Sequence, residues 1–174
     1  MGDIPGLREK TSTDGADFRV SSKPHPRQWY SFKFKQCALR YEITLSIQSG
    51  DIVWASSAFK ASTHDITIFR IGGLKDKLIQ AGEKTVCDLG YRGEPDVVTL
   101  SNSGSQMFQE QMSSVRARHE TVNRRMKVFQ VLNENFRQGI EFHNTCFDAV
   151  LVLTQLNMQN GEPLFSVKFT GEDE

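Results

Sequence analysis

Two neighbouring runs of residues, 40–48 and 51–59, have the composition of β-strands. In the first run, RYEITLSIQ, every second residue from Tyr41 to Ile47 is apolar and the residues between them are mostly polar. This period of two is typical of a strand that buries one face. The connector Ser49-Gly50 suits a tight turn. The pattern therefore predicts a β-hairpin over residues 40–59.

Helical periodicity dominates the second half of the chain. From Met112 to Phe136, apolar residues recur at steps of three and four, which predicts one long helix over residues 106–137. A second helix is predicted over residues 141–158. Residues 64–80 suit short helices that are interrupted at Gly72-Gly73. Short apolar strands are predicted in DFRV, KTVCD and DVVTL. This order of strands and helices predicts a mixed α/β layer fold.

Composition sets limits on the class of protein. The 174 residues suit one domain, and 21 basic residues balance 21 acidic ones. Contact with nucleic acid must therefore come from local basic patches. The three cysteines form no CxxC pair, which argues against a disulfide framework or a cysteine-based zinc site. The first ten residues lack the apolar run of a signal peptide, and the longest apolar stretch is too short to span a membrane.

Three acidic residues are candidates for a metal site. Asp14 precedes the apolar segment DFRV, Asp88 ends the predicted strand KTVCD, and Glu120 lies on the long predicted helix. Two strand-end aspartates and a helix glutamate can converge at one edge of a sheet, where their mutual repulsion requires a cation. Oxygen ligands of this kind suit Mg²⁺ or Mn²⁺, and a pair of ions about 4 Å apart would promote phosphodiester cleavage.

Each of these residues also has an ordinary interpretation. Asp14-Gly15 is a common turn dipeptide, and Asp88 could cap the end of a strand. Glu120 could form ion pairs with arginines four residues away on either side. The residues taken singly leave both interpretations open.

Together, five segments resemble the nuclease domain of Harbinger-type transposases, which belong to the DDE superfamily with related bacterial insertion-sequence enzymes. The segments are DGADFRV, KFKQCALRYEITLSIQSGDIVWASSAF, STHDITIFR, VCDLGYRGE and RHETVNRRMKVF, and the resemblance extends from about Asp14 to Val167. It implies an RNase H-like fold, a mixed sheet flanked by helices, and metal-dependent cleavage of DNA at transposon ends.

The resemblance also implies residue roles. The first and second aspartates of the family motif fall on Asp14 and Asp88, and the glutamate falls on Glu120. Asp65, in a recurrent His-Asp pair, is a secondary candidate, for which a helix N-cap is the alternative.

Basic residues near these positions are candidates for DNA binding. Arg116, Arg124 and Lys127 lie close to Glu120 at helical spacing, where they suit phosphate groups. Lys33 and Lys35 belong to a basic and aromatic loop that could hold a DNA backbone and stack on an unpaired base. A solvated charged face and a loop packed on the core are the respective alternatives. His119 falls on the apolar stripe, which favours a core residue.

The expected organisation is a flexible arm at 1–13, the nuclease domain at 14–168 and an acidic tail at 169–174. The family carries a DNA-binding region ahead of the nuclease domain, whereas this chain starts close to Asp14. Two hypotheses follow. In the first, the chain is a catalytic domain, an N-terminally truncated copy that works with a separate DNA-binding partner protein. In the second, it is a domesticated, non-catalytic DNA-binding or interaction module. A nuclear location follows from the family alone, and no membrane association is expected.

Overall fold

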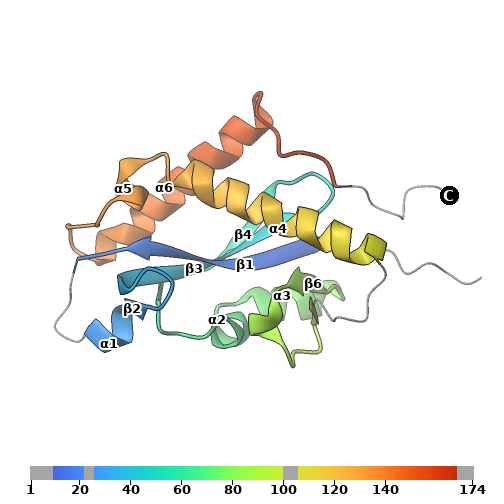
Figure 1. Cartoon of the computed structure of the whole chain (residues 1–174), viewed down its shortest axis with the longest axis horizontal. Coiled ribbons are helices and arrows are strands. Elements are labelled where there is room, and N and C mark those ends of the chain that lie inside the picture. Colours follow the sequence, from blue (N-terminus) through green and yellow to red (C-terminus); the bar gives the residue numbers. More distant parts are fainter. Residues whose placement is uncertain (1–9, 22–25, 100–105, 168–174) are drawn as a thin grey trace, which may run out of the picture.

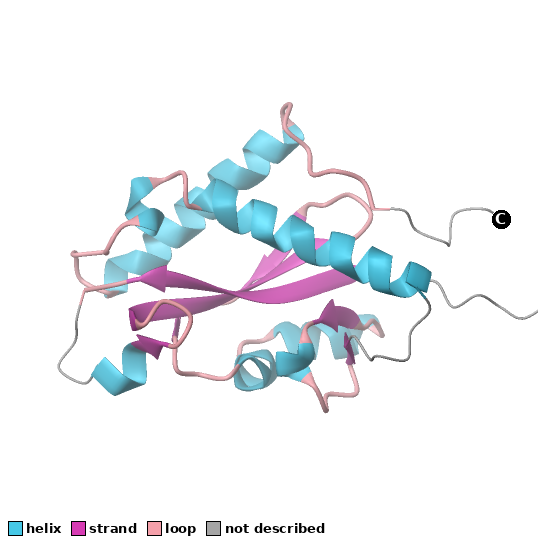
Figure 2. Ribbon diagram, in the orientation of Figure 1, coloured by secondary structure: helices cyan, strands magenta, loops and turns pink. Residues whose placement is uncertain are grey.

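The computed structural model describes residues 10–21, 26–99 and 106–167. Within them, seven strands form one mixed sheet (Figures 1 and 2). The strands are β1 (Thr11–Arg19), β2 (Tyr30–Ser31), β3 (Gln36–Ser46), β4 (Ile52–Ala55), β5 (Phe59–Lys60), β6 (Thr85–Cys87) and β7 (Val97–Thr99). The helices are α1 (Pro26–Trp29), α2 (Asp65–Ile71), α3 (Leu74–Ala81), α4 (Gln106–Met126), α5 (Gln130–Asn133) and α6 (Glu141–Gln159), with a 3₁₀ turn, η1 (Leu89–Tyr91).

Strand order is β2-β3-β1-β6-β7, and β4 and β5 also pair with β3. The strands around β3 are antiparallel, whereas β1, β6 and β7 run parallel. The connection from β1 to β6 passes through further strands and the helices α2 and α3, whereas residues 88–96 with the 3₁₀ turn η1 join β6 to β7. Helices pack on both faces of the sheet, with α4 and α6 on one face and α2 and α3 on the other (Figure 1). This arrangement confirms the predicted RNase H-like mixed sheet flanked by helices.

Two apolar cores hold the layers together. On one face, Phe18 and Tyr41 from the sheet pack against Phe147 of α6, and Tyr41 stacks on Phe147 with ring centroids 3.7 Å apart. On the other face, Phe69 of α2 meets Tyr91 of η1 edge to face. The alternation of side chains along β1 and β3 sends successive residues to these two faces.

The structure confirms the predicted hairpin, the two helices broken at Gly72-Gly73, and the helix near residues 141–158. Gly73 has a φ of 100°, a left-handed conformation that favours glycine at this break. Within the described residues, no helix has both the length and the apolar character needed to cross a membrane.

The predicted helix over residues 106–137 is wrong in its second part. Helix α4 ends at Met126, and the short α5 follows after a turn. The turn allows Phe136 to reach β1, where its backbone nitrogen donates to the Arg19 carbonyl at 3.1 Å. Apolar periodicity continues through the break because Leu132 and Phe136 enter the same core as α4.

The predicted arm at residues 1–13 is too long, because β1 already begins at Thr11; residues 1–9 and 169–174 lie outside the described residues. Ser12 and Thr13 are buried despite their polarity. The Thr13 hydroxyl lies 2.9 Å from the hydroxyls of both Thr44 and Thr85, on the two neighbouring strands. This polar part of the strand is tolerated in the centre of the sheet because the buried hydroxyls of Ser12 and Thr13 have partners.

Candidate functional site

The pairing of β1 with β6 brings the first two candidate aspartates side by side. Ser12 is the register partner of Val86 in this parallel pair. Asp14 and Asp88 each lie two residues further along the chain. Their side chains therefore lie near one another, on the same face of the sheet as those of Ser12 and Val86. Asp14 lies inside β1, not at a strand end as the sequence suggested.

Helix α4 covers this face and brings the third candidate. The Ser12 hydroxyl lies 2.9 Å from Nε2 of His119, the residue before Glu120. On the same face Val86 packs with Val115 of α4. His119 is buried, as its place on the apolar stripe predicted, and burial lowers its pKa to about 4. The imidazole is therefore neutral at physiological pH and serves to dock α4 on β1.

A cavity of about 540 Å³ opens between these elements. Its lining includes all three candidate carboxylates, Asp14, Asp88 and Glu120, together with the basic side chains Lys33 and Arg116. The three residues that are distant in sequence thus share one cavity. Their catalytic role stays a prediction.

Opposed electrostatic effects act on Asp14. Burial, and then the nearby Asp88 carboxylate, raise the pKa of Asp14 to about 6. The Gly15 backbone N–H, which donates to Asp14 Oδ1 at 2.8 Å, and the Lys33 ammonium act in the opposite direction. Asp88 caps the 3₁₀ turn η1, where it accepts the Gly90 N–H at 2.8 Å, and not the end of a strand; this capping role and its place at the cavity coexist. A cation in the cavity would relieve the strain on these two carboxylates.

Glu120 is exposed on α4. Across the parts of the chain that the structure describes, it forms no ion pair with Arg116 or Arg124, contrary to the ordinary interpretation of this helix face. Its carboxylate is thus free to face the cavity that it lines.

The donor set fits a divalent cation in its chemistry. Asp14 and Asp88 offer hard carboxylate oxygens, and burial together with the repulsion from Asp88 already raises the pKa of Asp14. In this arrangement, no group of three or more acidic, histidine or cysteine side chains within the described residues lies close enough to hold one ion. Asp14 and Asp88 are therefore the principal candidates for ligands, and a contribution from Glu120 stays a prediction.

Asp65 lies against two glycines, Gly15 and Gly90, that are close in sequence to Asp14 and Asp88. A Cβ atom added to Gly15 would lie 2.8 Å from Asp65 Oδ1, and one added to Gly90 would lie 3.0 Å from Asp65 Oδ2. A side chain at either position would therefore displace the Asp65 carboxylate from its present place. The interpretation of Asp14-Gly15 as a turn is wrong, because Gly15 is a strand residue opposite Glu42. The N-cap interpretation of Asp65 is also wrong, since His64 occupies that position.

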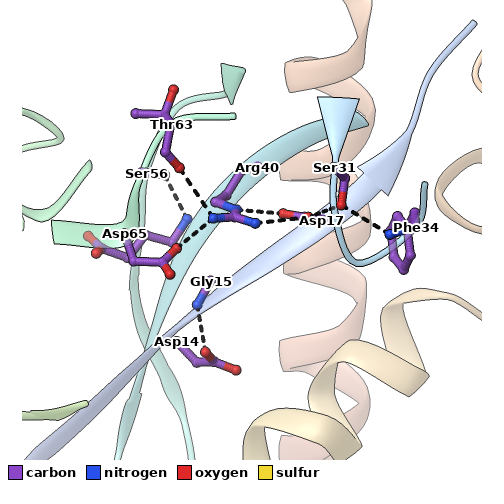
Figure 3. A network of polar contacts seen from close by, with 10 residues as sticks. Asp14, Gly15, Asp17, Ser31, Phe34, Arg40, Ser56, Thr63 and Asp65 are labelled. Carbon is purple, nitrogen blue, oxygen red and sulfur yellow. Dashed lines mark hydrogen bonds and ion pairs between the residues drawn. The ribbon is translucent and has the colours of Figure 1, made fainter. Parts of the chain in front are cut away.

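Asp65 is held by a buried ionic network (Figure 3). Arg40 on β3 donates to both oxygens of Asp17 on β1, with Nε–Oδ1 and Nη2–Oδ2 distances of 2.7 and 3.0 Å. Its Nη1 donates to Asp65 Oδ1 at 3.0 Å and to the Thr63 carbonyl at 3.2 Å. Arg40 thus ties the start of α2 to the two central strands. Asp14, one residue before Gly15 on β1, faces away from this network (Figure 3).

The basic candidates occupy three kinds of place. Lys33 and Arg116 line the cavity, whereas Arg124 and Lys35 are exposed beyond its lining. Lys127 lies over the rings of Phe34 and Phe18, with its ammonium 4.8 and 5.4 Å from their centroids. The solvated-face interpretation therefore fits Arg124 better than Arg116.

Sequence reasoning missed Arg40, Asp17 and Ser31. Each has an unremarkable sequence context, and only the β1–β3 register, in which Asp17 faces Arg40, brings the charges together. Two opposite charges in neighbouring strands were a weak signal, because nothing in the chain specified that these strands pair.

A mixed sheet of this strand order is flanked by helices, and Asp14 of β1, Asp88 just after β6 and Glu120 of α4 line one cavity; this is the architecture of an RNase H-like fold. Residues 13–155 match the family model described as DDE superfamily endonuclease, so the chain belongs to that family. It is also 24% identical over 127 residues to the "Probable transposase for insertion sequence element IS702" of Microchaete diplosiphon. The match covers 66% of this chain and 45% of that relative, so the chain spans less than half of the relative's length. No solved structure matches the chain.

Proposed function

We propose that this chain is the catalytic domain of a transposase of the Harbinger branch, a divalent-metal-dependent DNA endonuclease in which Asp14, Asp88 and Glu120 are the catalytic, metal-binding carboxylates. The observation that carries the proposal is the single cavity that all three line, together with Lys33 and Arg116. Membership of the DDE superfamily endonuclease family supports the same reaction class.

In this proposal Asp14 and Asp88, with Glu120 from α4, hold Mg²⁺ or Mn²⁺. When bound, such an ion makes water or a 3′-hydroxyl a better nucleophile and stabilises the leaving oxygen of the phosphodiester. The pKa of Asp14, about 6 without metal, means that cation binding displaces any proton that remains on this carboxyl near neutral pH.

The basic side chains have a different role. Lys33 and Arg116 lie where a phosphate entering the cavity would meet positive charge, and their charge offsets that of the scissile group. Lys35, Arg124 and Lys127 are assigned to the DNA on either side of that phosphate, where each contact neutralises backbone charge without reading sequence. Recognition of a particular transposon end would then rest with a separate DNA-binding partner, and a nuclear location remains a proposal from the family.

The test is cleavage of a labelled duplex with Mn²⁺ by the full chain, by Asp88→Ala and by Asp76→Ala. Asp76 is an exposed aspartate on α3 outside the cavity lining, so it controls for the loss of an acidic side chain. We expect nicking that EDTA abolishes, that falls at least about 100-fold in Asp88→Ala, and that is unchanged in Asp76→Ala. Nicking that survives Asp88→Ala would reject the site. Tight DNA binding by a folded protein without any nicking would favour the non-catalytic module.

A further inference from the structure

The turn between β2 and β3, residues 31–35, holds a large aromatic side chain in solvent. Phe32 is 83% exposed, more than any other large apolar side chain that the structure describes. A single exposed apolar residue is ordinary on a protein surface. The surroundings of Phe32 are what set it apart.

The 31–35 turn is anchored from below. Ser31 is fully buried, and its hydroxyl donates to Asp17 Oδ2 at 2.6 Å, on the same carboxylate that Arg40 binds. The Ser31 hydroxyl also accepts the Phe34 N–H at 3.2 Å, and the Ser31 carbonyl accepts the Lys35 N–H at 2.7 Å. The backbone that carries Phe32 is thus preorganised by the network that also holds Asp65.

The other aromatic residues of the region are engaged. Phe34 is partly buried, with the Lys127 ammonium 4.8 Å and the Arg19 guanidinium 5.2 Å from its ring centroid. Trp29 packs against the core below Lys60. Tyr30 contacts the Phe32 ring edge to face at a centroid distance of 5.4 Å, which leaves a face of Phe32 open to a partner. Phe32 is therefore the aromatic residue of this turn that is available for stacking.

The turn also borders the cavity and is positively charged. Lys33, the neighbour of Phe32, lines the cavity with Asp14 and Asp88. Lys35 is exposed, and Arg19 and Lys127 lie at the foot of the turn, on Phe34. Asp17, the acidic residue beneath, is buried and paired. An exposed ring among cations complements a ligand that combines negative charge with flat apolar surfaces, which is the chemistry of an unpaired nucleotide.

We propose that Phe32 stacks on an unpaired base of the DNA strand whose phosphate lies at the cavity, so that the preferred substrate has a single-stranded or frayed nucleotide beside the cleavage position. The proposal rests on the proposed endonuclease function and names the form of DNA that its site receives. A fully paired duplex buries the faces of its bases in the stack, so Phe32 would gain nothing from it.

The experiment measures binding of the full chain, with Ca²⁺ in place of Mn²⁺ to prevent cleavage, to two matched oligonucleotides. One is a fully paired duplex, and the other is the same duplex with a three-nucleotide single-stranded overhang that carries 2-aminopurine, whose fluorescence falls on stacking. The variants are Phe32→Ala, Phe32→Trp and Phe165→Ala. Phe165 is an exposed aromatic residue that contacts Arg118. The Arg118 guanidinium also donates to the Ile47 carbonyl, which lies beyond the end of β3 that is opposite to the turn.

We expect the natural chain to bind the overhang about tenfold more tightly than the paired duplex and to quench 2-aminopurine. Phe32→Ala should lose both the preference and the quenching while its affinity for paired duplex is unchanged. Phe32→Trp should restore them, and Phe165→Ala should behave as the natural chain. Far-UV circular dichroism checks that each variant is folded.

Two results would overturn this inference and leave the proposed function standing. One is quenching by Phe32→Ala that equals that by the natural chain. The other is an equal loss of affinity for both oligonucleotides, which would indicate a structural role or a protein-binding surface. In either case nicking that depends on Asp88 would still stand. Absence of DNA binding by the natural chain, with no metal-dependent nicking, would remove the proposed function and this inference together.

Discussion

Removal of the Arg40 charge should be among the most damaging substitutions in this chain. Asp17 has a side chain only 2% exposed, and Arg40 provides it with a two-point, charge-assisted contact. Arg40→Met keeps the length and apolar stem of the side chain but leaves the Asp17 carboxylate buried, with the Ser31 hydroxyl as its remaining hydrogen-bond partner among the described residues. Breaking a buried ion pair on one side costs about 3–5 kcal/mol. We expect a loss of that size in the free energy of unfolding.

A double-mutant cycle separates the pair from its surroundings. Asp17→Leu with Arg40→Met removes both charges, so the double variant should lose clearly less than the sum of the two single variants, by about 2–3 kcal/mol. Urea denaturation followed by circular dichroism supplies all four free energies of unfolding. Arg40→Met should also weaken metal-dependent nicking in protein that remains folded, because Arg40 holds Asp65 against the glycines beside Asp14 and Asp88.

Two results would refute this reasoning. A cost below about 1 kcal/mol for Arg40→Met would show that Asp17 is solvated or protonated without difficulty in the folded chain. Strict additivity in the cycle would show that the two side chains act independently. The matched control is Lys10→Met, which removes an exposed lysine from its surface pair with Glu83 and should change stability little.

Two further substitutions test the polar interior. Thr13→Val keeps the shape of the side chain but removes the hydroxyl shared with Thr44 and Thr85, so urea denaturation should show a loss of about 1–3 kcal/mol; no loss would mean that these hydroxyls do not stabilise the sheet. Glu42 is fully buried, and this burial raises the pKa of its carboxyl to about 8. The nearby Tyr91 hydroxyl favours the ionised carboxylate, although it forms no hydrogen bond with either carboxylate oxygen. Because the folded pKa exceeds the unfolded value, the natural chain should lose stability as the pH rises from about 4.5 towards 8. Glu42→Gln should make that slope shallower, most clearly between pH 7 and 8.5, because the raised pKa of Asp14 adds a loss of the same sign up to about pH 6. Stabilities at pH 5, 7 and 8.5 that fall in parallel for both proteins would contradict the prediction.

Local pattern was sufficient for most elements of the fold. The alternation from Tyr41 to Ile47, the Gly72-Gly73 break and the periodicity of α6 each predict an element that forms where expected. These signals survive because side-chain period and turn chemistry depend on residues near one another in the chain. The end of α4 was not predictable in this way, because its core-facing residues continue past the break into α5.

For the candidate site, the sequence by itself determined the residue types, the motifs around Asp14, Asp88 and Glu120, and through them the family to which the chain belongs. Only the tertiary structure decided that these carboxylates share one cavity, that Asp65 lies against Gly15 and Gly90, and that Phe32 is held in solvent by an anchored turn. The physical reason is strand pairing. The β1–β6 and β1–β3 registers bring together residues far apart in the chain, and no local sequence pattern specifies which strands will be neighbours.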